Sequence, residues 1–150
     1  MKRRIIILGS VVLLVVAAWS IAWLVLAGMV RQNVEALALA DGEMAPRLAC
    51  QRLNVGGFPF RFDVDCGAAE IVSGDMVFTV PGLRASVRVY APMHVYASAR
   101  SPLEFADSFT GTRNRLAWGG LEASVRIDDW RIARLSVSGS DLVWSDTLLD

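Results

Sequence analysis

The chain has 150 residues, enough for one domain or for one domain with a membrane anchor. Its 15 basic residues balance its 15 acidic residues, so net charge offers no general attraction to a polyanion. Lys2, Arg3 and Arg4 precede a long apolar segment, and the mildly acidic remainder argues against a nucleic-acid partner, because such binding depends on clustered Lys and Arg.

The first predicted element is a membrane-spanning helix. From Ile5 to Val30 there are 26 consecutive residues without a charge. As a helix they would extend about 39 Å, which exceeds the ~30 Å hydrocarbon core of a bilayer. Three cations precede the segment and Arg31 alone directly follows it, which indicates a cytoplasmic N-terminus. We predict that residues 1–30 form a single-pass anchor in a bacterial inner membrane and that the rest is periplasmic.

A cleaved signal peptide is the alternative interpretation of this segment. Val25-Leu26-Ala27 would fit a small-residue cleavage site before Gly28. The apolar run is much longer than the ~7–15 residues usual in a signal peptide, and Trp19 and Trp23 lie toward its outer end, where indole rings favour the membrane interface. A retained anchor is therefore preferred, and under either interpretation the following domain is exported.

A short helical stalk is predicted for residues 31–45. Val30, Val34 and Leu37 recur at the spacing of one helix face, and Gly42 is a plausible terminator. The remaining residues, 46–150, are assigned to a β domain.

The β domain is predicted from apolar residues that alternate with polar ones. In the first such segment Phe58, Phe60, Phe62, Val64 and Cys66 oppose Pro59, Arg61, Asp63 and Asp65. The same period recurs in 83–90, 93–100 and 121–128, with turn signals between the runs, whereas 101–115 is unpatterned and is predicted to be a loop. The pattern assigns one apolar sheet face to Val87, Val89, Val95, Val125 and Ile127, and the opposite face to Arg84, Arg88, His94, Arg100 and Arg126.

An apolar sheet face must be covered by a second sheet, a helix, a ligand or the curling of the sheet itself. The sequence offers no second amphipathic helix. We therefore expect one transmembrane helix followed by a mainly β domain, built as a curved antiparallel sheet that forms an open half-barrel or groove.

Two cysteines, Cys50 and Cys66, flank the first strand region. An even pair in an oxidising compartment is typical of a disulfide, and two buried free thiols are the alternative. A bridge that closes a loop of this length would stabilise the fold by roughly 3 kcal/mol in the chain-entropy model.

The sequence contains few residues in the patterns that catalytic sites require. His94 is the only histidine, so a zinc site or a catalytic triad lacks its usual residues. The carboxylate pairs Asp63 with Asp65 and Asp128 with Asp129 fit a solvated strand face and a turn better than acid–base catalysis. No phosphate-binding loop or nucleophile elbow is present. We expect no catalytic residue, no metal and no cofactor, and hence no enzyme.

The stretch from Cys50 to Cys66, with its Gly57-Phe58-Pro59-Phe60-Arg61 core, resembles the signature of an uncharacterised bacterial envelope family, domain of unknown function 2125. Tyr90-Ala91-Pro92-Met93-His94 resembles a later element of that family. Its members usually run well beyond this length, which leaves open a short member or the front part of a longer sheet. More distantly, the architecture is similar to AsmA-like envelope proteins, a resemblance that implies lipid handling on a curled sheet.

The preferred function is non-enzymatic handling of lipid, or of another apolar envelope molecule, along the dry face of the sheet. The alternative is an envelope scaffold, in which that face packs internally and the anchor or the predicted loop at 101–115 meets a partner protein.

Overall fold

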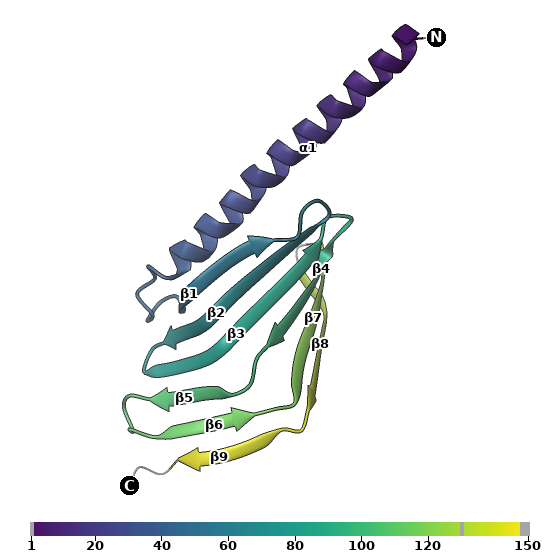
Figure 1. The fold of residues 1–150 in the computed structure, drawn as a ribbon. Coiled ribbons are helices and arrows are strands. Elements are labelled where there is room, and N and C mark those ends of the chain that lie inside the picture. The colour runs from purple at the N-terminus through teal and green to yellow at the C-terminus, as the bar shows by residue number, and fades with distance from the viewer. Residues whose placement is uncertain (1, 130, 148–150) are drawn as a thin grey trace.

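The computed structural model describes residues 2–129 and 131–147 of the chain. One long helix, α1 (Lys2–Leu37), precedes a single antiparallel sheet that curls into a half-barrel, as Figure 1 shows. This confirms the predicted fold class. The strands are β1 (Arg47–Gly56), β2 (Arg61–Ser73), β3 (Met76–Arg88), β4 (Ala91–Ala99), β5 (Leu103–Asp107), β6 (Arg113–Ala117), β7 (Gly120–Asp128), β8 (Arg131–Ser140) and β9 (Val143–Thr147).

Helix α1 continues without a break past the end of the uncharged run at Val30. In the described part of the chain it is the one helix long and apolar enough to cross a membrane. After its end, Asp41 Oδ1 accepts the backbone N–H groups of Glu43 and Met44, which organises the turn into β1. Gly42 lies in this turn with a φ of 82°, a conformation that glycine adopts without strain.

The sheet divides along β3. Its first half, Met76–Thr79, pairs with β5, and its second half, Leu83–Arg88, pairs with β4. Strands β4, β7 and β8 therefore form one arm of the sheet, and β5, β6 and β9 form the other (Figure 1). Strands β1 and β2 extend the opposite side of β3.

A bend in β2 changes which side chains face the concave side. Ala68 has a φ of 51° and lies opposite Pro81, which lacks an N–H, so this position is missing from the β2–β3 ladder. Cys66 and Ala69 are both buried although they are three residues apart. Ala69 is paired with Cys50, whose side chain is bonded to Cys66, so all three lie on one face. The left-handed conformation at Ala68 thus reverses the alternation.

The predicted loop at 101–115 is wrong, because β5 and β6 form a hairpin there. Glu104 and Arg115 form an ion pair across it, and Asp107 Oδ1 accepts the backbone N–H of Phe109 in the turn. Hydrogen bonds from the Thr110 hydroxyl and from the backbone N–H groups of Phe109 and Thr110 hold the pKa of Asp107 below its ordinary value. Each strand has only five residues; β5 pairs with the first half of β3, and β6 pairs with β5 and β9, so these strands form through pairing rather than through a long alternating pattern.

Few side chains are enclosed. Among the described residues the buried apolar side chains are Trp23, Cys66, Ala69, Val80 and Trp118. Trp118 fills the division between the two arms, where its indole N–H donates to the carbonyl of Ala99. The described strands form one sheet without a second one stacked on it, so the concave face is covered only in part.

Candidate functional site: an apolar cavity on the concave face

A cavity of about 430 Å³ lies on the concave face between the sheet and α1. Twelve of its fourteen lining residues are apolar, and they come from α1 and from six strands. They are Val34, Leu48, Cys50, Val64, Cys66, Leu83, Ala85, Ala97, Ala99, Leu121, Ala123 and Val137, together with Arg84 and Ser98.

The hollow arises from a row of alanines across three strands. Ala85 pairs with Ala97, and Ala97 pairs with Ala123, so their methyl groups share one face in one line. On one side of this row lie Leu83 and Leu121, and on the other lie Val87, Val95 and Val125. Small side chains between larger ones leave the space that larger ones would fill. The cavity is therefore a consequence of residue size along the strands.

Helix α1 supplies one wall of the site. Val34 lines the cavity, and Trp23 stacks on Phe62, which lies on the same concave face. Trp23 also donates its indole N–H to the carbonyl of Arg61, at 3.3 Å, and Trp19 donates to the carbonyl of Pro59, at 3.0 Å. These contacts hold the C-terminal half of the helix along the β1 side of the half-barrel (Figure 1).

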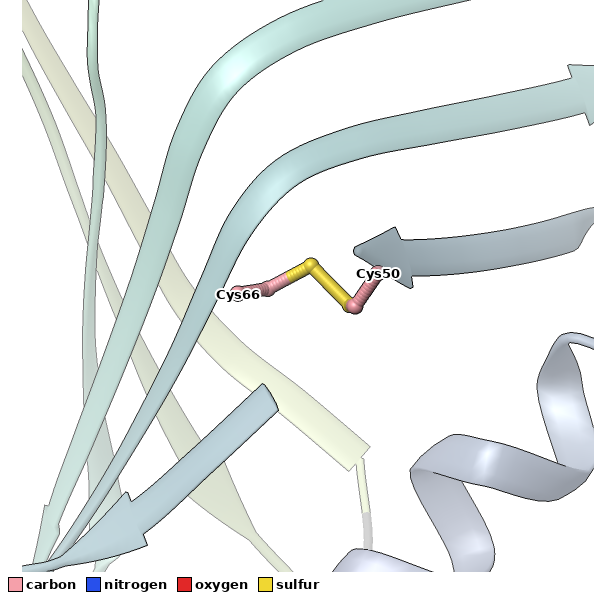
Figure 2. Close-up of a disulfide and its surroundings, with 2 residues drawn as sticks. All are labelled: Cys50 and Cys66. Carbon is pink, nitrogen blue, oxygen red and sulfur yellow. A yellow bond between two sulfur atoms is a disulfide. The ribbon is translucent and has the colours of Figure 1, made fainter. Parts of the chain in front are cut away.

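The Cys50–Cys66 disulfide forms part of the cavity wall. Figure 2 shows the bridge between β1 and β2, with a turn of helix nearby. The two Cα atoms are 5.3 Å apart, within the usual range for a disulfide. The bridge ties edge strand β1, against which α1 packs, to β2, the next strand of the sheet.

The five residues assigned to the apolar face from sequence do not line the cavity. Val87, Val95 and Val125 lie directly opposite one another in the next row of the concave face, toward the β3–β4 turn. Val89 lies beyond the end of β3, and Ile127 pairs with Ile132 past a register shift. Sequence reasoning missed the alanine row and Val34. The alternating pattern contained the alanines, but nothing in it indicated which row is hollow.

The convex face is polar. Arg84, which also borders the cavity, forms an ion pair with Asp65 at 2.5 Å, and this hydrogen-bonded carboxylate raises the pKa of Arg84. Ser86 donates to Asp63, which also pairs with Arg61. In the described part of the chain no group of three His, Cys, Asp or Glu side chains is arranged to hold a metal ion. The concave cavity is the site on this domain best suited to a ligand, and that ligand would be apolar.

Comparison with known proteins gives a family match alone. The model of a bacterial family described as "Uncharacterized protein conserved in bacteria (DUF2125)" matches residues 23–148, from the tryptophan that stacks on Phe62 through the last described strand. No curated protein and no solved structure matches the chain.

Proposed function

Because the chain belongs to the uncharacterised bacterial family DUF2125, we propose its function from its geometry: it is a non-enzymatic protein of the inner membrane that binds lipid acyl chains in the concave cavity. The binding domain faces the periplasm, and another elongated apolar envelope molecule would satisfy the same chemistry.

The observation that carries this proposal is the cavity itself. Its volume of about 430 Å³ is within the ~300–1,000 Å³ typical of small-molecule sites. Pockets for polar ligands present several converging polar groups, whereas this lining is apolar in all but two residues. An acyl chain requires only dry surface, and its burial is favourable by roughly 0.8 kcal/mol per methylene.

The position of the cavity supports membrane lipid as the ligand. The same helix that provides Val34 to the cavity is apolar enough to cross a bilayer. The row of Val87, Val95 and Val125 continues the apolar face from the cavity toward the turns that contact Trp19 and Trp23. A lipid leaving the bilayer would meet apolar side chains along this whole path.

Two observations support the periplasmic location. Disulfides persist in the periplasm and are rare in the cytosol, and this domain contains one. Lys2, Arg3 and Arg4 precede the uncharged segment, as is typical of a cytoplasmic N-terminus.

A crosslinking experiment tests the function. The full chain is reconstituted in vesicles that contain a phospholipid with a photoreactive acyl chain, and the crosslinked peptides are identified by mass spectrometry. We expect crosslinks in β4 and β7, beside the alanine row, in addition to those of the anchor.

Two adjacent substitutions provide a matched pair. Ala123→Phe fills the cavity and should reduce the β4 and β7 crosslinks at least several-fold, whereas Ser124→Phe, on the opposite face of the same strand, should leave them unchanged. Crosslinks confined to α1 in the unsubstituted protein would contradict lipid binding and favour the envelope scaffold.

A further inference from the structure

The strand connections at one end of the sheet lie beside the helix. Arg61, which follows the β1–β2 turn, pairs with Arg88 at the end of β3, and the backbone N–H of Val89 donates to the carbonyl of Phe60. Because β4 pairs antiparallel with β7 and β7 pairs antiparallel with β8, the end of β7 and the start of β8 lie at this end too (Figure 1). We call this end, with its turns at 57–60 and 89–90 and the ends of the strands that meet there, the rim.

The rim exposes large apolar side chains. Phe60 is 63% exposed, Tyr90 72% and Ile132 70%, and Phe58 and Met93 are also exposed. They come from the β1–β2 turn, from the β3–β4 turn with the start of β4, and from the start of β8, so they gather because of the fold and not because of one local segment. A soluble surface rarely groups such side chains unless they meet another molecule.

The length of α1 places the rim at the membrane boundary. The uncharged run begins at Ile5, and about 20 helical residues cross a ~30 Å hydrocarbon core, so the helix leaves the hydrocarbon near Leu24. Trp19, which donates a hydrogen bond to the β1–β2 turn, and Trp23, which donates one to Arg61 just after that turn, both lie within two helical turns of Leu24. The helix stays uncharged as far as Val30, so no charged residue forces residues 19–23 away from the bilayer. The rim, which these residues contact, therefore lies close to the membrane surface.

The rim also carries cationic side chains, which lie on its convex side. Arg61 lies opposite Arg88, and His94, Arg126 and Arg134 follow one another across β4, β7 and β8. Like charges directly opposite each other destabilise a sheet, so a bound anion would be favourable at this position. Among the described residues Arg61 has Asp63 as an ion-pair partner, whereas no carboxylate lies within salt-bridge distance of Arg126 or Arg134.

We propose that the rim docks onto the periplasmic leaflet of the membrane that α1 spans, with its apolar side chains in the interface and its arginines against anionic lipid headgroups. The inference rests on the anchoring of α1 and not on the ligand of the cavity. Docking would open the apolar concave face directly onto the bilayer, which is the source of the proposed ligand.

A depth measurement on the full chain tests this proposal. Tyr90→Cys at the rim and Phe109→Cys in the β5–β6 turn at the far end each receive an environment-sensitive fluorophore, with the native disulfide kept. The proteins are reconstituted in phosphatidylcholine vesicles with brominated acyl chains, with or without phosphatidylglycerol. We expect quenching several-fold stronger at position 90 than at 109, and stronger again with phosphatidylglycerol.

Charge reversal tests the headgroup contacts. Arg126→Glu with Arg134→Glu should remove the effect of phosphatidylglycerol, whereas Arg47→Glu, at the far end of β1, should not. Equal and weak quenching at 90 and 109 would overturn docking, and an absent phosphatidylglycerol effect would overturn its electrostatic part. Quenching at 90 without crosslinks in β4 and β7 would uphold docking while contradicting lipid binding in the cavity.

Discussion

The indole of Trp23 lies flat against the ring of Phe62, with ring centroids 5.4 Å apart and planes 5° from parallel. Phe58 meets the same indole edge-on, at 5.5 Å. Trp23 is only 8% exposed, although most of the helix around it is open. This contact joins the long apolar helix to the sheet.

Loss of this contact should loosen the domain. We expect Trp23→Ala to lower the free energy of unfolding by about 3 kcal/mol, because Phe62 loses its stacking partner and the packing around the indole is lost. Trp19→Ala should have a clearly smaller effect, since Trp19 is 39% exposed. Urea unfolding of the full chain in detergent micelles, followed by near-UV circular dichroism, measures both. Equal effects would show that the stack contributes nothing specific.

The glycine before Phe58 should resist substitution. Gly57 has a φ of 100°, and an added Cβ would lie 2.5 Å from the carbonyl oxygen of Arg61. Gly57→Ala should therefore destabilise the domain by about 1–3 kcal/mol through strain. At the neighbouring Gly56 a Cβ would meet nothing within 4 Å, so Gly56→Ala is the matched control. The same unfolding assay compares the two, and a tolerated Gly57→Ala would contradict the tight approach of this turn to Arg61.

Reduction of the disulfide should weaken the fold without abolishing the sheet. The bridge spans 16 residues, and its removal should cost about 3 kcal/mol. Unfolding midpoints with and without reductant measure the change, and the Cys50→Ser, Cys66→Ser double variant should not respond to reductant. Thiol labelling of denatured, unreduced protein should find almost no free cysteine. Complete labelling of both residues would refute the bridge.

Membrane topology is open to a direct assay. A phosphatase reporter that folds only in the periplasm, fused after Asp150, should be active, because cations that precede an apolar segment, here Lys2, Arg3 and Arg4, favour a cytoplasmic N-terminus. A fusion that accumulates but is inactive would reverse the assigned orientation. Replacing the three cations with glutamate should lower the activity.

A charge on the apolar path should block lipid entry. Val125 is half-buried between Val95 and Leu135, in the row that leads from the cavity to the rim. Val125→Asp should remove the acyl-chain crosslinks in β4 and β7, whereas Ser124→Asp on the convex face should preserve them. Near-UV circular dichroism checks that each variant is folded. Unfolding by Val125→Asp alone would instead indicate a sealed core, as the scaffold alternative requires, because an unpaired charge would then be buried.

Local pattern was sufficient for the parts of the fold that depend on local physics. An uncharged run of 26 residues predicts a long apolar helix because unpaired charges and open backbone groups are costly in hydrocarbon. Alternation in 83–90 and 121–128 predicts half-solvated strands, because successive side chains of a strand point to opposite faces. The curled sheet follows from an apolar face with no second layer in the sequence to cover it.

Tertiary structure alone decided where the site lies. The reversal of alternation at Ala68 depends on a left-handed backbone conformation that the sequence pattern does not predict, and it brings Cys66 and Ala69 to one face. The cavity depends on Ala85, Ala97 and Ala123 coming into one row, which requires the register of three strands. The stack of Trp23 on Phe62 joins residues from separate elements. Register and long-range packing are set by the whole sheet. The alternation within one strand therefore predicts which side chains share a face, but not which residues of other strands lie beside them.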